Sequence, residues 1–419
     1  MNIFEKHESN VRSYCRSFPD IFHRAKGSIV YAESGQEYID FFAGAGALNY
    51  GHNHDYIKQK VISYLDADGI AHGLDMYTSA KEKFLAKFHE VILSTKHLDY
   101  RVQFCGPTGT NAVEAALKLA RKVKKRPGIF SFMGAYHGMT LGSLSITANT
   151  AIRAGAIGTL NSVTFMPYPY GFMESFDTIK YIESVLNDVS SGIEKPAAII
   201  FETVQAEGGV IVAPIEWVQR LRKLCDEHDI LLICDDIQVG CGRTGSFFSF
   251  ERASIVPDIV ILSKSISGYG FPMSLLLMKP ELDIWEPGEH NGTFRGNQLA
   301  FVGATAALEY RENSSLEQDV KTKELFLKNF LSQQISPINE NIAIRGIGMI
   351  WGIDLANFGG RNLSKNITMC CFEKGLIVES AGRNDTVIKL LPPLTIDMPT
   401  LKKGCSIIET AFNECLGIN

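Results

Sequence analysis

The sequence predicts an α/β protein in which a mainly parallel sheet is flanked by helices. Continuous apolar runs at 197–201, 231–234 and 259–262 are typical of strands that are buried on both faces. The segment 217–228, between the first two runs, predicts a helix, so strands and helices alternate along the middle of the chain. In such a fold the active groups are expected at the carboxyl ends of the strands.

The composition is that of a metabolic enzyme whose partners are small molecules or a second copy of the chain. The 419 residues, of which 45% are hydrophobic and 21% charged, can bury a core larger than that of one ordinary domain. The net charge of −5 provides no general attraction to nucleic acid or to an anionic membrane.

The chain is expected to be a cytoplasmic protein without a metal site. The segment 1–18 lacks the apolar core of a signal peptide, and no stretch reaches the roughly twenty apolar residues of a membrane helix. The nine cysteines, scattered from Cys15 to Cys415, form neither a disulfide framework nor a paired metal-ligand pattern. The ten histidines show no H-E-x-x-H arrangement, which disfavours a metal hydrolase.

Two charged residues follow predicted strands. Asp235 comes directly after the run at 231–234, and Lys264 follows the run at 259–262. Pyridoxal 5′-phosphate needs a lysine that bonds to its aldehyde and a carboxylate that keeps its pyridine nitrogen protonated. Taken singly, Lys264 is typical of a solvated surface lysine, and Asp235 of a helix N-cap.

The wider phrase around these residues favours the cofactor interpretation. Asp235-Asp236-Ile237-Gln238 is followed by Gly242-Arg243-Thr244-Gly245, by Pro257-Asp258 and by Lys264. In this order and spacing the phrase resembles the class III aminotransferases of fold-type I, and the resemblance extends along nearly all of the chain. It implies a pyridoxal 5′-phosphate enzyme in which Asp235 and Lys264 are catalytic.

The resemblance also implies how the chain is divided and paired. A large cofactor domain is expected at about 50–300, and a smaller α/β domain is expected to be built from 1–49 and 301–419. In the family, the threonine of an H-x-x-T-F-x-G-N segment contacts the phosphate of the neighbouring subunit's cofactor. Thr293 takes that position here, so a homodimer or a higher homo-oligomer is expected.

Position in the family assigns the groups around the cofactor ring. Asp235 is expected to face the pyridine nitrogen, Gln238 the phenolic oxygen and Lys264 the aldehyde. Tyr136 stands where relatives stack an aromatic ring on the pyridine face; a tyrosine packed in the core is the plain alternative. The small-residue segment 43–51 is expected to form either the mouth of the pocket or a tight crossover.

The phosphate site is expected at Thr108, Gly109 and Thr110, which run directly into a predicted helix. Free amides and the positive dipole end of a helix favour an anion at such a turn. The three residues align with the phosphate turn of the family, in which glycine permits close backbone approach. A turn with an ordinary helix cap is the plain alternative.

Glu207 and Lys389 are the candidates for substrate binding. Glu207 aligns with a glutamate that in relatives pairs with a C-terminal arginine, and Lys389 occupies the position of that arginine. Lysine keeps the charge but lacks the planar fork that binds a carboxylate. Lys389 can therefore bind a substrate carboxylate, pair with Glu207 or point away. Met139 stands where 4-aminobutyrate and ornithine transaminases typically have arginine.

These departures are found in one subgroup, the diaminobutyrate–2-oxoglutarate transaminases of ectoine synthesis and related pathways. The segments 137–142, 235–251 and 389–396 closely resemble that subgroup. The resemblance implies transfer of an amino group from L-glutamate to L-aspartate 4-semialdehyde, which gives L-2,4-diaminobutyrate and 2-oxoglutarate. Similar enzymes supply siderophore and peptide-antibiotic synthesis, so the pathway stays open.

Three other functions fit parts of the pattern. A transaminase for another ω-amino acid (ornithine, lysine or 4-aminobutyrate) uses the same cofactor groups but fits Met139 and Lys389 less well. An aminomutase or racemase of the same fold would yield no stoichiometric 2-oxoglutarate. A cofactor-binding module that serves as a regulator or assembly subunit is disfavoured by the intact Lys264, Asp235 and phosphate turn.

Overall fold

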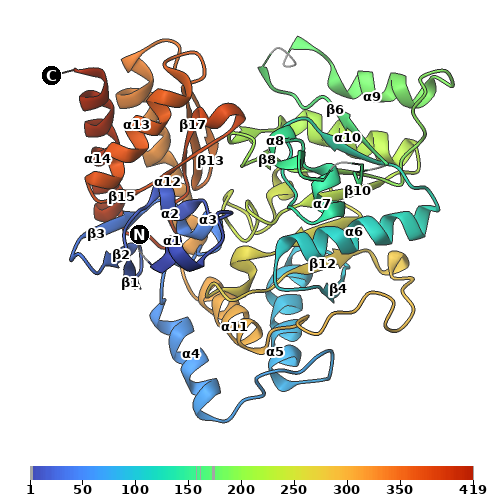
Figure 1. Ribbon diagram of the computed structural model, residues 1–419. Coiled ribbons are helices and arrows are strands. Elements are labelled where there is room, and N and C mark those ends of the chain that lie inside the picture. Colours follow the sequence, from blue (N-terminus) through green and yellow to red (C-terminus); the bar gives the residue numbers. More distant parts are fainter. Residues whose placement is uncertain (1–2, 157, 161, 172–174, 419) are drawn as a thin grey trace.

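Two groups of elements lie side by side in the protein (Figure 1). One group is built around a seven-stranded sheet, and the other around two four-stranded sheets near both ends of the chain. The computed structural model describes residues 3–156, 158–160, 162–171 and 175–418. The division into domains at residues 50 and 300 remains a prediction. Residues 1–2 and 419, which the predicted small domain includes, lie outside the described ranges.

The seven-stranded sheet has the order β4-β12-β11-β10-β7-β5-β6. Its strands are β4 Arg101–Phe104, β5 Ile129–Phe132, β6 Val163–Met166, β7 Ala198–Phe201, β10 Leu231–Asp235, β11 Ile259–Leu262 and β12 Leu275–Met278. β10 is parallel to β7 and β11, β5 is parallel to β7 and β6, and only β12 runs antiparallel to its neighbours β11 and β4. The sheet is therefore mainly parallel, as predicted.

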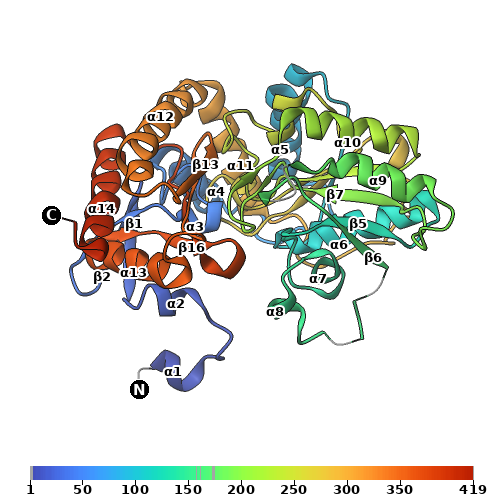
Figure 2. The ribbon, with the colours of Figure 1, turned by 90° about the horizontal axis from the view of Figure 1, so that it is seen from above.

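Helices cover both faces of this sheet. Successive strand residues point to opposite faces, so Leu232 packs in the cluster with α10 (Ile215–Glu227), whereas Ile233 packs in the cluster with α6 (Gly109–Lys124). Figure 2 shows α10 and α6 on opposite sides of the strands. The helix predicted at 217–228 is α10, and burial on both faces explains why the strands are uniformly apolar.

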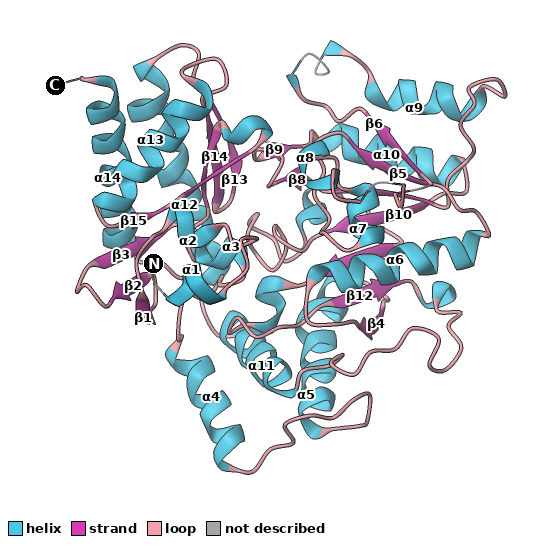
Figure 3. Cartoon of the chain, viewed as in Figure 1, coloured by secondary structure: helices cyan, strands magenta, loops and turns pink. Residues whose placement is uncertain are grey.

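In the described residues, twelve further α-helices lie around the sheets or in the connections between strands (Figure 3). They are α1 Ile3–His7, α2 Tyr14–Ser17, α3 Ala43–Gly46, α4 Asp55–Asp66, α5 Ser79–Phe88, α7 Leu141–Ile146, α8 Thr150–Arg153, α9 Thr178–Asn187, α11 Gln298–Glu312, α12 Leu316–Phe330, α13 Gly360–Glu373 and α14 Met398–Leu416. Within the described ranges, none of the helices combines the length and the apolar character needed to cross a membrane.

The described part of the chain also forms three smaller sheets, one of which joins distant parts of the sequence. In the first, the order is β1-β2-β3-β15, and β15 joins β3 in parallel with Leu376 opposite Ile39. The second has the order β13-β14-β17-β16, and β8 and β9 form a two-stranded sheet. The bounds are β1 Phe22–Lys26, β2 Ile29–Ala32, β3 Glu37–Asp40, β8 Val204–Gln205, β9 Ile211–Val212, β13 Ala343–Ile347, β14 Ile350–Asp354, β15 Leu376–Ile377, β16 Glu379–Ala381 and β17 Val387–Leu390.

A buried arginine ties the two groups of elements together. The guanidinium of Arg243 donates hydrogen bonds to the carbonyl of Met349 at 3.0 Å and to the carbonyl of Pro392. It also donates to Asn49 Oδ1 at 2.6 Å. Burial lowers the pKa of Arg243 to about 9. One side chain therefore donates hydrogen bonds to three segments that lie far apart in sequence.

Replacing Arg243 with methionine is expected to lower the free energy of unfolding by at least about 3 kcal/mol, because buried acceptors lose their donors. Urea denaturation followed by circular dichroism measures this loss. Arg220→Met is the control, since Arg220 makes an exposed ion pair with Asp177 at 2.8 Å and its loss should cost less than about 1 kcal/mol. Equal losses in the two variants would contradict the role given to Arg243.

Candidate active site

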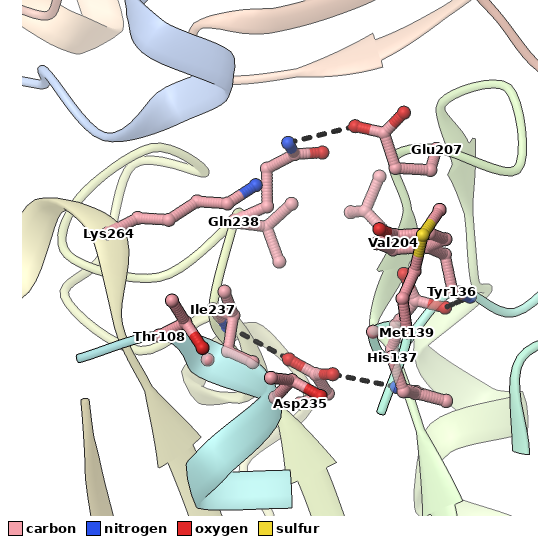
Figure 4. Close-up of a pocket in the computed structure, with 15 residues that line it drawn as sticks. Thr108, Tyr136, His137, Met139, Val204, Glu207, Asp235, Ile237, Gln238 and Lys264 are labelled. Carbon is pink, nitrogen blue, oxygen red and sulfur yellow. Dashed lines mark hydrogen bonds and ion pairs between the residues drawn. The ribbon is translucent and has the colours of Figure 1, made fainter. Parts of the chain in front are cut away.

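A cavity of about 330 Å³ opens at the carboxyl ends of β5, β7, β10 and β11. The carboxyl edge of a parallel sheet is where ligands bind in folds of this kind. Its lining residues are Thr108, Gly109, Thr110, Tyr136, His137, Gly138, Met139, Glu202, Val204, Glu207, Asp235, Ile237, Gln238, Val239 and Lys264. In Figure 4, Lys264 and Thr108 lie on one side of the cavity, and Tyr136 and Met139 lie on the other.

The structure brings most of the predicted site residues into this cavity. All of the residues predicted from the phosphate turn and the cofactor ring are among those that line it, and Glu207 joins them. Lys389 is instead wholly buried behind Glu207, with an exposed side-chain fraction of 0%. Thr293 is exposed on the loop before α11 and does not line the cavity.

Asp235 is held at the bottom of the cavity by two hydrogen bonds. Its Oδ2 lies 2.7 Å from Nδ1 of the buried His137, and its Oδ1 accepts the backbone N–H of Ile237 at 3.1 Å. These contacts fix the position of the carboxylate. His137 therefore supports Asp235, and such a buried carboxylate suits a protonated ring nitrogen.

The neighbouring acid Asp236 serves the structure and not the cavity. Its Oδ2 accepts the backbone N–H of Ser249 at 2.9 Å, and its Oδ1 accepts the hydroxyl of the same residue. Burial raises the pKa of Asp236 to about 7, Asp235 acts in the same direction, and the hydrogen bonds from Ser249 oppose the shift. Of the two acids, Asp235 lines the cavity and Asp236 does not.

Lys264 extends its amine into the cavity from the end of β11. Nζ donates a hydrogen bond to the carbonyl of Ala45 at 2.8 Å, so segment 43–51 borders the site at its backbone. The backbone of Lys264 has φ +53°, a strained left-handed conformation of the kind that clusters at functional sites. Burial lowers the pKa of the amine to about 8, with Glu207 opposing this shift and Lys389 adding to it.

The predicted phosphate turn forms the start of α6. Gly109 is the first residue of that helix, so backbone N–H groups of its first turn can bind an anion at this end. A Cβ on Gly109 would lie only 2.7 Å from Ile237 Cδ1, so a larger residue here would require the Ile237 side chain to shift. Thr108 Oγ1 donates to Asn111 Oδ1 at 3.0 Å, and Thr110 Oγ1 donates to Ser143 Oγ at 2.7 Å.

A row of alternating charges closes the other side of the cavity. Nζ of Lys389 lies 2.6 Å from Glu207 Oε1 and 2.9 Å from Glu379 Oε1. Burial alone would lower the pKa of Lys389, but the two carboxylates raise it. Burial favours the neutral form of Glu207, yet the charges of Lys389 and Lys264 outweigh it and lower its pKa to about 2. Of the alternatives for Lys389, pairing with Glu207 is the one observed.

Glu379 is a site residue that the sequence reasoning missed. It stands directly opposite Lys389 in the antiparallel pair β16–β17, and its side chain is 11% exposed. Burial raises the pKa of Glu379, whereas Lys389 opposes that shift. The sequence could in principle have indicated this pair, because a β-hairpin that spans residues 379–389 places Glu379 directly opposite Lys389.

The residues present fit pyridoxal 5′-phosphate. Gln238 Nε2 donates to Ala45 O at 2.8 Å and to Glu207 Oε1 at 3.0 Å, which fixes the amide in the cavity. Its Oε1 is buried and has no hydrogen-bond partner within the described part of the chain, as expected of a group that faces a polar ligand. A lysine amine, a held carboxylate and a helix N-terminus are thus brought to one cavity.

The chain resembles known proteins over almost all of its length. The sequence model of a family described as "Aminotransferase class-III" matches residues 13–412. A protein of Halalkalibacterium halodurans, named diaminobutyrate–2-oxoglutarate transaminase, is 54% identical over 415 residues, which cover 98% of this chain and 96% of that protein. A Wolinella succinogenes protein of the same name is 53% identical over 417 residues, which cover 99% and 97% of the two chains.

Solved structures confirm the predicted fold. An ornithine aminotransferase of Toxoplasma gondii ME49 has a TM-score of 0.86 and 24% identity, covering 99% of this chain and 94% of that chain. An amine transaminase from an uncultivated Pseudomonas species has a TM-score of 0.85 and 24% identity, covering 99% of both chains. The backbone therefore has the fold of these transaminases.

Replacing Lys389 with methionine is expected to destabilise the protein by about 3 kcal/mol at pH 8, because two buried carboxylates lose the charge between them. The pKa values of Glu207 and Glu379 would then lie above those of the unfolded chain, so the loss should shrink as the pH falls toward 5 and the carboxyls take up protons. Urea denaturation at both pH values measures this dependence.

The exposed Lys403 provides a matched control for this test. Lys403→Met removes the same charge from the surface and should change the free energy of unfolding by less than about 0.5 kcal/mol at either pH. A loss in Lys389→Met that does not vary between pH 8 and pH 5 would mean that the paired carboxylates do not account for it.

Proposed function

Because the chain belongs to the class III aminotransferases, which are enzymes dependent on pyridoxal 5′-phosphate, we propose that it makes diaminobutyrate. In this proposal the α-amino group of L-glutamate replaces the aldehyde oxygen of L-aspartate 4-semialdehyde. The products are L-2,4-diaminobutyrate and 2-oxoglutarate. The observation that carries the proposal is the 54% identity, over 98% of this chain, to a relative named for that reaction.

The cofactor, when bound, supplies an aldehyde that takes up the amino group and a ring that withdraws electrons. Lys264 would hold it at the aldehyde, and Asp235 would hold the proton on the ring nitrogen. The amides of Gly109 and Thr110, at the start of α6, would bind its phosphate. Tyr136 is proposed to stack on one ring face and Gln238 to face the phenolic oxygen.

Lys264 is the proposed general base. Its pKa of about 8, lowered by burial, keeps part of the amine neutral near neutral pH and able to accept a proton. Nζ can take the proton from the substrate carbon that bears the amine and later return it. The carbonyl of Ala45 accepts a hydrogen bond from Nζ and so orients the amine within the cavity.

The enzyme is proposed to act as a homodimer in the cytoplasm, where free amino acids are its substrates. Thr293 supports the dimer, since it is exposed here and would reach the cofactor phosphate of the other subunit. Exposed apolar side chains surround its loop: Phe294 has an exposed fraction of 71% and Tyr77 of 100%. Asp75, two residues before Tyr77, pairs with Arg295 at 3.2 Å and joins the two segments.

Purified, cofactor-loaded protein is expected to convert L-2,4-diaminobutyrate and 2-oxoglutarate into equal amounts of glutamate and aspartate semialdehyde. Ornithine and lysine, tested in parallel, should react at least about tenfold less efficiently in kcat/KM, since each added methylene changes the fit in a closed pocket. Product chromatography measures both reactions. A preference for ornithine or lysine would overturn the substrate proposal but keep the transaminase, whereas an aminomutase or racemase would give no stoichiometric glutamate.

Lys264→Ala is expected to abolish turnover, because the variant loses both the bond to the cofactor and the proton carrier. Lys279→Ala removes a lysine that pairs with Asp258 away from the cavity, at 2.7 Å, and is the control for the loss of a lysine. Steady-state assays with diaminobutyrate compare the two. Normal turnover by Lys264→Ala would refute the catalytic role of this lysine.

A further inference from the structure

The charged row at the back of the cavity contains more acid than base. Two carboxylates, Glu207 and Glu379, flank the single ammonium of Lys389 at 2.6 and 2.9 Å. Lys389 is wholly buried and lies between them, so it is already paired on two sides. When both carboxylates are ionised, the row has a net charge of −1. Such a row attracts a cation and does not offer a free lysine to a carboxylate.

Glu207 is the member of the row that a ligand can reach. It lines the cavity and its side chain is 32% exposed. The hydrogen bonds from Gln238 and Lys389 both go to Oε1, at 3.0 and 2.6 Å. A carboxylate has acceptor sites on both oxygens, and among the residues that the structure describes both of these donors use Oε1, so Oε2 is left to a group inside the cavity.

The charges of the row act on the amine of Lys264, the proposed catalytic base. Glu207, Glu379 and Lys389 all influence the pKa of the Lys264 amine. A substrate whose terminal carbon reacts beside Lys264 therefore lies within the electrostatic field of the row. Diaminobutyrate and aspartate semialdehyde both react at carbon 4 and both carry an ammonium group on carbon 2.

We propose that Glu207 binds the carbon-2 ammonium of these two substrates, and that Glu379 enables this by sharing Lys389. This inference rests on the proposed function and adds the group that recognises its substrates. Without Glu379, Glu207 and Lys389 form a neutral pair, and the attraction for a cation is lost. Glu379 is thus a positioning residue that sets specificity through Lys389, while Glu207 makes the contact.

The test compares two donors that differ only in the recognised group. 4-Aminobutyrate is diaminobutyrate without the carbon-2 ammonium. The wild-type protein should have a higher kcat/KM for diaminobutyrate than for 4-aminobutyrate. In Glu379→Gln, which keeps the shape and removes the charge, this ratio should fall about tenfold, through KM for diaminobutyrate and with little change in kcat. Glu373→Gln, a variant of an exposed acid at the end of α13, should leave the ratio unchanged.

The possible results distinguish the proposed function, the ammonium site at Glu207 and the role of Glu379. No turnover of diaminobutyrate by the loaded wild-type protein overturns the proposed function. If the wild-type protein uses diaminobutyrate and 4-aminobutyrate with equal kcat/KM, the proposed binding of the ammonium by Glu207 is wrong, although the proposed function stands. This comparison needs no variant, so it remains decisive even if Glu379→Gln fails to fold. If folded Glu379→Gln keeps the wild-type ratio of kcat/KM for the two donors, the role given to Glu379 is wrong. The same holds if the variant loses activity only through kcat for diaminobutyrate.

Discussion

The parallel pairing of β10 with β7 and β11 is the constraint on which the site depends. It aligns the strands so that their carboxyl ends meet at one edge, with Asp235 opposite Ile261 and Lys264 three residues beyond it. Two charged groups from separate parts of the sequence are thereby brought to one cavity without any direct contact between them. Helices on both faces keep water away from the strands, so these groups act in surroundings where charge has large effects.

Much of the fold could be predicted from local signals in the sequence, whereas most of the residues that line the cavity were predicted from the order of motifs shared with a family. The buried strands are continuous apolar runs, and the phosphate turn is a short stretch of small residues before an amphipathic helix. The contact between His137 and Asp235 and the carbonyl of Ala45 beside Lys264 could not be predicted, since they join residues that no local pattern connects. Glu379 was missed because it acquires its role only from its cross-strand position opposite Lys389.

The site shows how burial and pairing together set the protonation of its groups. Lys264 and Lys389 are both lysines at the same cavity, but burial lowers the pKa of one and two carboxylates raise the pKa of the other. The amine of Lys264 can therefore exchange protons near neutral pH, whereas Lys389 stays charged. The pKa values of two lysines thus shift in opposite directions because their surroundings differ. Residue type alone therefore does not reveal which lysine can act as a base.

The three acceptors of Arg243 have a consequence for how the protein is made. Asn49 is translated before Arg243, but Met349 and Pro392 are translated well after it. The strands β1 to β3 likewise wait for β15 to complete their sheet. A nascent chain that has finished its central sheet can therefore pair Arg243 with Asn49 but still lacks the two carbonyl acceptors. The hydrogen bonds that tie the two groups of elements together are complete only after residue 392 has been translated.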